Sequence, residues 1–343
     1  MKRWKKFALA LLVVVALTQI PFAYRRYKLG RLDERIRQLN SERAPADDSD
    51  PYEDHAGVLH VHSALSHDSE GTPAEIVRAA KANGLAFVVM TEHPSAHADT
   101  AEATLRGTHD GVLFVGGSET VAAGGERLLV VPGSSPPGGR PLSAQETVNR
   151  AKAEGRLVFV AYPEQLNGLS FDGFDGIEVY NLYTNTKRIN YARLAFDALW
   201  SYASYPELLF ATFYERPADN LRRWDELTRA EAGRPLVAVA GNDAHQNVGL
   251  RLQLPAGRTL LRLQLDPYER SFRVVRTHAL IERGRALDET ALISALARGR
   301  CFISFDLFGD ATGFRFTAHN ASETRPMGDE IRRDGPVSLR VRA

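Results

Sequence analysis

The feature that most constrains the fold of this chain is a regular alternation, beginning near residue 56, of short apolar runs with amphipathic segments. In order, the apolar runs are AGVLHVH, LAFVVMTEH, GVLFVGGSE, RLVFVAYPE, GIEVYN and PLVAVAGNDAH. Helices are predicted between them over residues 72–83, 143–154, 190–202 and 218–232. Strands that alternate with helices form parallel β/α units, and runs that are apolar on both faces need a sheet that is covered on both sides. The number of units predicts an α/β fold with a closed or nearly closed barrel, and a doubly wound open sheet is the alternative.

The segment TPAEIVRAAKANG has the clearest helix boundaries. Thr72 is placed to cap the helix, Pro73 suits its first turn, and Glu75 follows the cap by three residues. Gly84 marks its end. These signals fix where one β/α unit turns from strand to helix.

The pattern changes after about residue 250, where apolar runs separated by turn residues replace the alternation. Strands are predicted in RTLLRLQL, RSFRVVRTHALI, GRCFISFDLF, GFRFTAHN and PVSLRVRA, with one helix over residues 288–298. We expect residues 56–250 to form the barrel, and residues 251–343 to complete it and to add a small antiparallel β appendage.

Residues 1–27 read as a membrane anchor or a signal. The apolar run from Phe7 to Tyr24 is about as long as the shortest segment that spans a bilayer, and its uninterrupted part also has the size of a signal-peptide core. No small-residue cleavage site follows it. We therefore expect an uncleaved single-pass anchor, with secretion after signal cleavage as the alternative. The short basic tail before the run is expected in the cytoplasm, which places the rest of the chain outside it.

Residues 28–55 read as a spacer, with a short helix predicted over residues 28–43, and a linker over residues 44–55. Leu29, Leu32, Ile36 and Leu39 follow a/d spacing for only about two heptads, fewer than a stable coiled coil needs. A membrane-proximal spacer is the simpler interpretation, and a weakly associating homodimer is the alternative.

Charge and cysteine content exclude several functions. The net charge is +1, which provides no overall field for nucleic acid, so a small-molecule substrate is expected and nucleic acid is not. The chain has one cysteine, which excludes an intrachain disulfide framework and a multi-cysteine zinc site.

Side chains that bind metals follow the apolar runs. In HVH the two imidazoles are two residues apart, so on a strand both face the same side. The carboxyl ends of parallel strands meet at one rim of a barrel, where active sites are built. The residues at these ends are His60, His62, His93, Glu119, Glu178, Asp243 and His245. One such residue is usually a core or loop residue, but the joint occurrence predicts a metal centre, and imidazoles with carboxylates suit zinc, manganese or iron.

The same residues resemble the PHP (polymerase and histidinol phosphatase) superfamily of metallohydrolases. The resemblance rests on LHVHSALSHDSEGTPAEIVRAAKANGLAFVVMTEH, GSE, IEVYN and GNDAH, in this order over residues 58–245. ALARGRCFISFD and the β-rich end are similar to the branch that includes carbaryl hydrolase. The resemblance implies a distorted seven-stranded β/α barrel with up to three divalent metal ions.

The resemblance also implies residue roles. His60, His62, Glu119 and Asp243 would hold one ion. His93 and His245 would hold another, with either His67 or Asp68 as a further ligand, and Glu119 would bridge to a further site. Residues expected near substrate or water are Glu92, Glu178 and Asn181.

Two positions depart from the family pattern. Tyr162 stands where the family commonly has a histidine, so two ions are as consistent with the sequence as three. Glu92 stands in TEH where the family has TDH, which makes it a longer carboxylate.

The expected function is that of a metal-dependent hydrolase, with phosphoesters favoured as substrates. A metal-activated hydroxide would attack phosphorus directly. An amide, ester or carbamate substrate is the first alternative, and a decayed metal-binding module of the cell envelope is the second. A basic residue aimed into the site would favour phosphate, and Arg216 and Lys187 are candidates by position.

Overall fold

The computed structural model describes residues 3–43, 49–134, 138, 140–166, 168, 170–186, 189–211, 214–230, 235–247, 249–253, 259–264 and 266–342. The chain divides into two compact units. The barrel unit comprises residues 44–184, 216–306 and 310–343, and the α1 unit comprises residues 1–43, 185–215 and 307–309.

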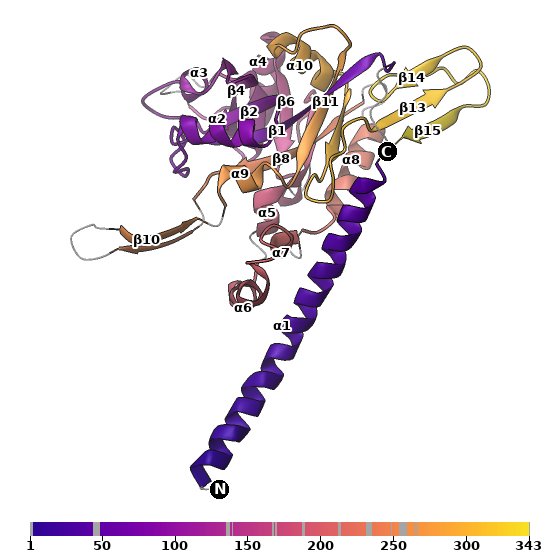
Figure 1. Cartoon of the computed structure of the whole chain (residues 1–343). Coiled ribbons are helices and arrows are strands. Elements are labelled where there is room, and N and C mark those ends of the chain that lie inside the picture. The colour runs from indigo at the N-terminus through magenta and orange to yellow at the C-terminus, as the bar shows by residue number, and fades with distance from the viewer. Residues whose placement is uncertain are drawn as a thin grey trace. The chain divides into compact units, whose positions relative to one another are not determined.

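Seven strands of the barrel unit form a closed barrel in the order β1-β2-β4-β5-β6-β7-β8, because β8 also pairs in parallel with β1 (Figure 1). The strands are β1 (Tyr52–Val61), β2 (Phe87–Glu92), β4 (Val112–Val121), β5 (Arg127–Val131), β6 (Leu157–Ala161), β7 (Gly176–Asn181) and β8 (Val237–Ala244). The predicted closed barrel is confirmed, and the open-sheet alternative is wrong.

Strand β5 is a barrel strand that the sequence pattern did not predict. It runs antiparallel to both neighbours, β4 and β6, whereas the other neighbouring pairs around the barrel are parallel. The reason is the connection from β4, which is a turn over residues 122–126 with Gly125 in the left-handed region. A turn of this length joins antiparallel strands, and a parallel crossover needs a dozen or more residues.

The predicted helices are present between the strands. Thr72 caps α2 (Pro73–Ala82) in a capping box with Glu75, as the sequence indicates, and Ser143 caps α4 (Ala144–Ala153) with Glu146 in the same way. The other helices of the barrel unit are α3 (Thr100–Ala103), η1 (Pro163–Gln165), α8 (Ala218–Ala230), α9 (Tyr268–Ser271) and α10 (Glu289–Ala297), and the boundary between the two units falls within α5 (Leu182–Thr186).

Alternate residues of the strands face two different cores. Phe87, Leu129 and Phe159 belong to a core inside the barrel, to which α10 contributes Leu292. Their neighbours in sequence belong to cores outside it, where Val88 shares a core with α2. Because apolar side chains fill the interior beneath them, the polar side chains near the carboxyl ends of the strands are gathered at one end of the barrel.

Further strands follow or flank the barrel. Strand β3 (Gly107–His109) pairs with β4, and β11 (Arg276–Glu282) pairs antiparallel with residues 52–57 of β1 and with β12 (Cys301–Ser304). A hairpin comprises β9 (Gly249–Gln253) and β10 (Thr259–Gln264). The predicted antiparallel appendage is present as β13 (Arg315–His319), β14 (Thr324–Pro326) and β15 (Ser338–Arg342).

The α1 unit is built on one long helix, α1 (Arg3–Ser41), which is long and apolar enough to cross a membrane (Figure 1). The short helix predicted over residues 28–43 is the C-terminal part of this helix. Helices α6 (Tyr191–Ser201) and α7 (Leu208–Ala211) belong to the same unit, where Leu29 shares an apolar core with Leu194 and Leu208.

Candidate metal centre

Four buried side chains from three strands, or from the residues next to them, converge at one end of the barrel: His60, His62, Glu119 and Asp243. His60 Nε2 lies 3.1 Å from Glu119 Oε2 and 3.3 Å from Asp243 Oδ1. His62 Nε2 lies 3.4 and 3.5 Å from the same two oxygens. Ligand atoms around a tetrahedral zinc ion, at bonds of about 2.1 Å, are about 3.4 Å apart. The group therefore has the spacing of a ligand set.

A second group lies beside the first and consists of Asp68, His93 and His245, with His62 shared between the two. Asp68 Oδ2 lies 3.1 Å from His93 Nε2 and 3.4 Å from His245 Nε2. The His62 and His245 rings stack at 4.2 Å between centroids. Glu119 Oε2 lies 3.6 Å from His93 Nδ1, so this carboxylate contacts both groups.

Three buried atoms in these groups have no hydrogen-bond partner: His62 Nε2, Asp68 Oδ1 and Asp243 Oδ1. Buried polar atoms are nearly always bonded, and such exceptions call for an explanation. All three are types of atom that bind divalent cations. The residues present therefore fit the divalent ions that the sequence implies.

The backbone at the first group departs from a regular strand. His60 has φ of 64° and Asp243 has φ of 48°, and the pairing of β1 with its neighbours shifts register at His60. Leu59 packs in the interior core and His60 next to it also points inward, because the irregularity adds a residue there. A left-handed non-glycine residue costs about 1–3 kcal/mol, and such residues cluster at functional sites.

Gly241 makes room for this arrangement. A Cβ at this position would lie 1.6 Å from Glu178 Oε1 and 3.1 Å from His60 Cβ. Only a residue without a side chain leaves space for the carboxylate that contacts His60.

Glu178 and Asn181, expected near substrate or water, lie beside the first group. Glu178 is fully buried, its Oε1 is 2.7 Å from His60 Nδ1, and its Oε2 accepts a hydrogen bond of 2.9 Å from Asn181 Nδ2. Asn181 Nδ2 also lies 3.3 Å from Asp243 Oδ2. These contacts orient the ring of His60 and the carboxylate of Asp243.

Glu92 is buried behind both groups. Its carboxylate accepts hydrogen bonds from the hydroxyls of Ser63, Ser66 and Thr104 at 2.6, 2.6 and 2.7 Å. Ser66 Oγ in turn lies 3.2 Å from His62 Nδ1 and accepts from the backbone N–H of His93 at 3.0 Å. Glu92 therefore positions the segment that carries the ligands.

Tyr162, at the position where the resemblance implied a histidine, is buried beside the first group. Its hydroxyl donates a hydrogen bond to Asp243 Oδ2, and its φ of 48° is in the left-handed region. Burial and the neighbouring carboxylates raise the pKa of the Tyr162 hydroxyl far above its ordinary value, so it stays neutral.

Arg127 is a site residue that sequence reasoning missed. It begins β5, and its Nη1 donates to Glu119 Oε1 at 2.9 Å. Its guanidinium lies over the Tyr162 ring, 5.3 Å from the centroid, and its side chain is 40% exposed. Recognising RLLVV as an antiparallel strand after a Gly-Gly turn would have placed this arginine opposite the end of β4.

Of the alternatives for the SHDS ligand, Asp68 belongs to the second group, whereas His67 is exposed and its ring lies 5.0 Å from that of His93. Arg216 is exposed, and Lys187 lies outside the described residues.

The charges of the site perturb its pKa values. Burial lowers the pKa of His60, but Glu178, Asp243 and Glu119 raise it more, so it lies well above its ordinary value. Burial also lowers the pKa values of His93 and His245, but their contacts with Asp68 and other carboxylates raise them above the ordinary value overall. Burial raises the pKa of Glu119, but His60 and His62 bring it well below the ordinary range. The negative charges of the buried carboxylates need compensating positive charge, which protons on the histidines or bound metal ions can supply.

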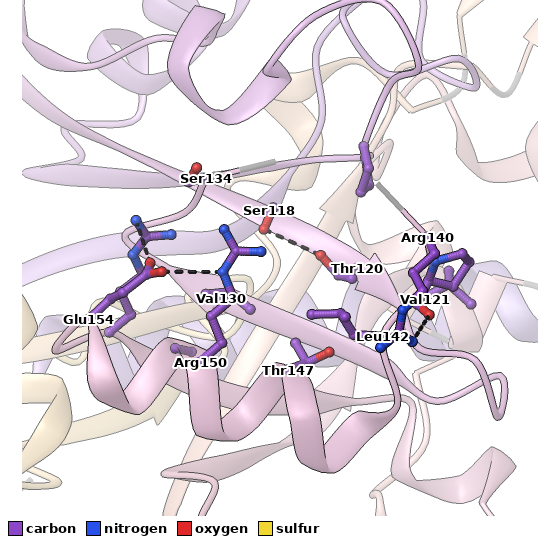
Figure 2. Close-up of a pocket in the computed structure, with 14 residues that line it drawn as sticks. Ser118, Thr120, Val121, Val130, Ser134, Arg140, Leu142, Thr147, Arg150 and Glu154 are labelled. Carbon is purple, nitrogen blue, oxygen red and sulfur yellow. Dashed lines mark hydrogen bonds and ion pairs between the residues drawn. The ribbon is translucent and has the colours of Figure 1, made fainter. Parts of the chain in front are cut away.

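A separate cavity of about 220 Å³ lies on the other side of β4. Ser118 and Thr120, which flank Glu119 in sequence, line it together with residues of β5 and α4 (Figure 2). Arg150 and Glu154 lie along one wall and form an ion pair of 3.2 Å. Because side chains alternate along a strand, this cavity is separate from the side that Glu119 faces.

Comparisons with known proteins give distant similarity. No protein-family model matches the chain. Over 148 residues, covering 38% of this chain and 85% of the relative, it is 29% identical to the uncharacterized protein MJ1587 of Methanocaldococcus jannaschii. Among solved structures, it is similar to a two-domain protein of Bacteroides vulgatus that contains a predicted PHP-like metal-dependent phosphoesterase. That match has a TM-score of 0.47 and 16% identity over 87% of this chain and 78% of the other. PsfC of Pseudomonas syringae matches with a TM-score of 0.43 and 16% identity over 74% and 92%.

Proposed function

We propose that this chain is a metal-dependent hydrolase of the PHP type that acts on a phosphoester of a small molecule. The observation that carries the proposal is the convergence of His60, His62, Glu119 and Asp243 at one end of the barrel, with buried ligand-type atoms left unpartnered.

In this proposal the centre holds two divalent ions, as in two-metal hydrolases. The first would be held by His60, His62, Glu119 and Asp243, and the second by Asp68, His93 and His245, with Glu119 reaching both. The described residues offer two ligand groups, and Tyr162 occupies an oxygen of Asp243 with a hydrogen bond. Such ions, when bound, lower the pKa of water and stabilise negative charge on a phosphoryl group.

The protein residues around the centre hold the ligands and receive the substrate. Glu178 fixes the tautomer of His60 by accepting a hydrogen bond from its Nδ1–H, so that Nε2 is free for an ion. Glu92 positions His62 and His93 through Ser66. These roles need no change of protonation during the reaction.

The position of Arg127 favours a phosphoester over a carbonyl compound as the substrate. Its Nη1 pairs with Glu119, and its side chain is partly exposed. A guanidinium presents its N–H donors in a fixed fork that matches phosphate oxygens. A neutral amide, ester or carbamate has one uncharged carbonyl oxygen and offers no pair of negatively charged oxygens to this fork.

The bond class is tested with the full chain in detergent, supplied separately with manganese and zinc. The substrates are bis(p-nitrophenyl) phosphate, p-nitrophenyl phosphate, p-nitrophenyl acetate and an aryl carbamate. The proposal predicts turnover of a phosphoester that is lost in His60→Ala. Turnover of only the acetate or the carbamate would favour a carbonyl hydrolase with the same centre, and metal binding without any turnover would favour a decayed binding module.

We also propose that α1 is an uncleaved anchor that crosses a membrane once, with the barrel outside the cytoplasm. The apolar run ends at Tyr24, and Arg25, Arg26 and Lys28 follow it at the level expected for a membrane surface. Isolation of a chain that lacks Met1 and begins near residue 24 would show a cleaved signal instead.

A further inference from the structure

The α1 unit contains a second helix with an apolar exposed face. In α6 the large side chains on this face are Phe196, Leu199 and Trp200, which are 44%, 81% and 38% exposed. Tyr191 and Tyr202 stand exposed at the two ends of the helix. We call these five residues the α6 apolar face.

The α6 apolar face lies away from the buried residues of this helix, although Phe196 and Trp200 at its edge contact α1. Leu194, Asp197 and Ser201 are the buried residues of α6, and Leu194 belongs to the core that includes Leu29 of α1. In an amphipathic surface helix the side opposite the core is charged or polar. Here the charged residues of the helix are Arg193 and Asp197, and Asp197 is buried and paired with Arg25 at 2.6 Å.

Helix α6 is attached to α1 at the end of its apolar run. Trp200 Nε1 donates to Gln19 Oε1 at 3.1 Å, and the rings of Phe196 and Phe22 are 5.0 Å apart. Arg26 donates to the carbonyl of Trp200 and, at 2.9 Å, to Ser204 Oγ. The attachment thus covers residues 19–26, where the apolar run meets the first basic residues.

We propose that the α6 apolar face lies in the surface of the bilayer that α1 crosses. Tryptophan and tyrosine are enriched at this level of a membrane, and interfacial helices bury an apolar face there. Arg25 and Arg26, which attach α6 to α1, would then lie at the level of the headgroups. The inference rests on the proposed span by α1, and it adds a second contact with the same membrane.

The test measures membrane depth at three positions of the full chain in proteoliposomes. Leu199→Cys probes the α6 apolar face, Val14→Cys probes the middle of the apolar run, and Asp219→Cys probes an exposed position on α8, each in a Cys301→Ala background. A nitroxide label is attached, and its collisions are measured with oxygen, which concentrates in lipid, and with a nickel chelate, which stays in water.

The proposal predicts that the label at position 199 collides more with oxygen than with the nickel chelate, whereas the label at position 219 shows the reverse. A position 199 label that behaves like position 219, while position 14 reports lipid, would overturn the proposal and leave the anchor intact. A position 199 label shielded from both reagents would indicate a protein contact and would also overturn it. If position 14 reports water as well, the span itself is wrong.

Discussion

The Nδ1 atom of His60 lies 2.7 Å from Oε1 of Glu178, and both side chains are fully buried. This contact joins an expected metal ligand to a carboxylate that lies outside both ligand groups. Supporting carboxylates of this kind typically contribute about 10- to 100-fold to metal affinity.

We predict that Glu178→Gln weakens metal binding at the first group by about 10- to 100-fold while the fold is retained. The amide keeps the volume of the side chain but removes the charge that orients His60. Calorimetric titration with zinc measures the change, and Glu154→Gln, directly after α4, is the matched control. Unchanged affinity in Glu178→Gln would show that this contact is unrelated to the metal.

We predict that Arg127→Met lowers kcat/KM for a phosphodiester by about 10²-fold, because a charge-assisted forked contact is lost. Metal content should stay at the wild-type level, because Arg127 contacts Glu119 Oε1 and not the oxygen shared with the histidines. Steady-state kinetics and metal analysis measure the two quantities, with Arg140→Met as the control. An equal loss with a neutral ester substrate would contradict a role in binding phosphate.

We predict that Gly241→Ala displaces Glu178 and lowers the free energy of unfolding by about 1–3 kcal/mol, the usual cost of adding a group to a packed interior. The new methyl group would overlap Glu178 Oε1. Gly335→Ala is the control, because a Cβ there has nothing within 4 Å. Denaturant unfolding of both variants checks the prediction, which fails if they are equally stable.

The pH dependence of stability should report on His278. This histidine is fully buried, and its Nδ1 lies 2.6 Å from Asp54 Oδ1. Burial lowers the pKa of His278, but Asp306 and Asp54 raise it to about 9 overall. Its ordinary pKa is about 6.5. Since the folded state binds the proton more tightly, this stabilisation is complete below about pH 6.5 and is lost as the pH rises through about 9.

We therefore predict that wild-type stability falls relative to His278→Gln between pH 6 and pH 10, by up to about 3 kcal/mol. Denaturant unfolding at the two pH values measures the difference. If the difference between the two proteins is the same at both pH values, the buried pair does not contribute in this way.

The sequence predicts the barrel, because burial on both faces makes each parallel strand a short continuous apolar run. It also predicts that the side chains at the ends of these strands lie together. It does not predict β5, since RLLVV is short and its partner is defined only by the turn before it. Arg127 was missed for the same reason. Period-two alternation predicts that His60 and His62 face one side, but the structure brings them together through an irregularity at His60 that no local pattern indicates.

The α1 unit shows a different limit of sequence reasoning. Residues 190–202 were predicted as one more helix of the β/α alternation, and α6 forms there. Its apolar core is shared with α1, about 170 residues earlier, as the Arg25–Asp197 ion pair also shows. The packing of α6 against α1 depends on tertiary contacts, which hydrophobic periodicity does not predict.

Metal content per chain shows whether the two ligand groups hold ions. Wild-type protein and the variants His60→Ala and Asp243→Ala are loaded with zinc, freed of excess metal by dialysis and quantified by mass spectrometry. We predict about two ions per chain in the wild type and the loss of about one in each variant, because both residues belong to the first ligand group. Full metal content in both variants, or none in the wild type, would contradict it.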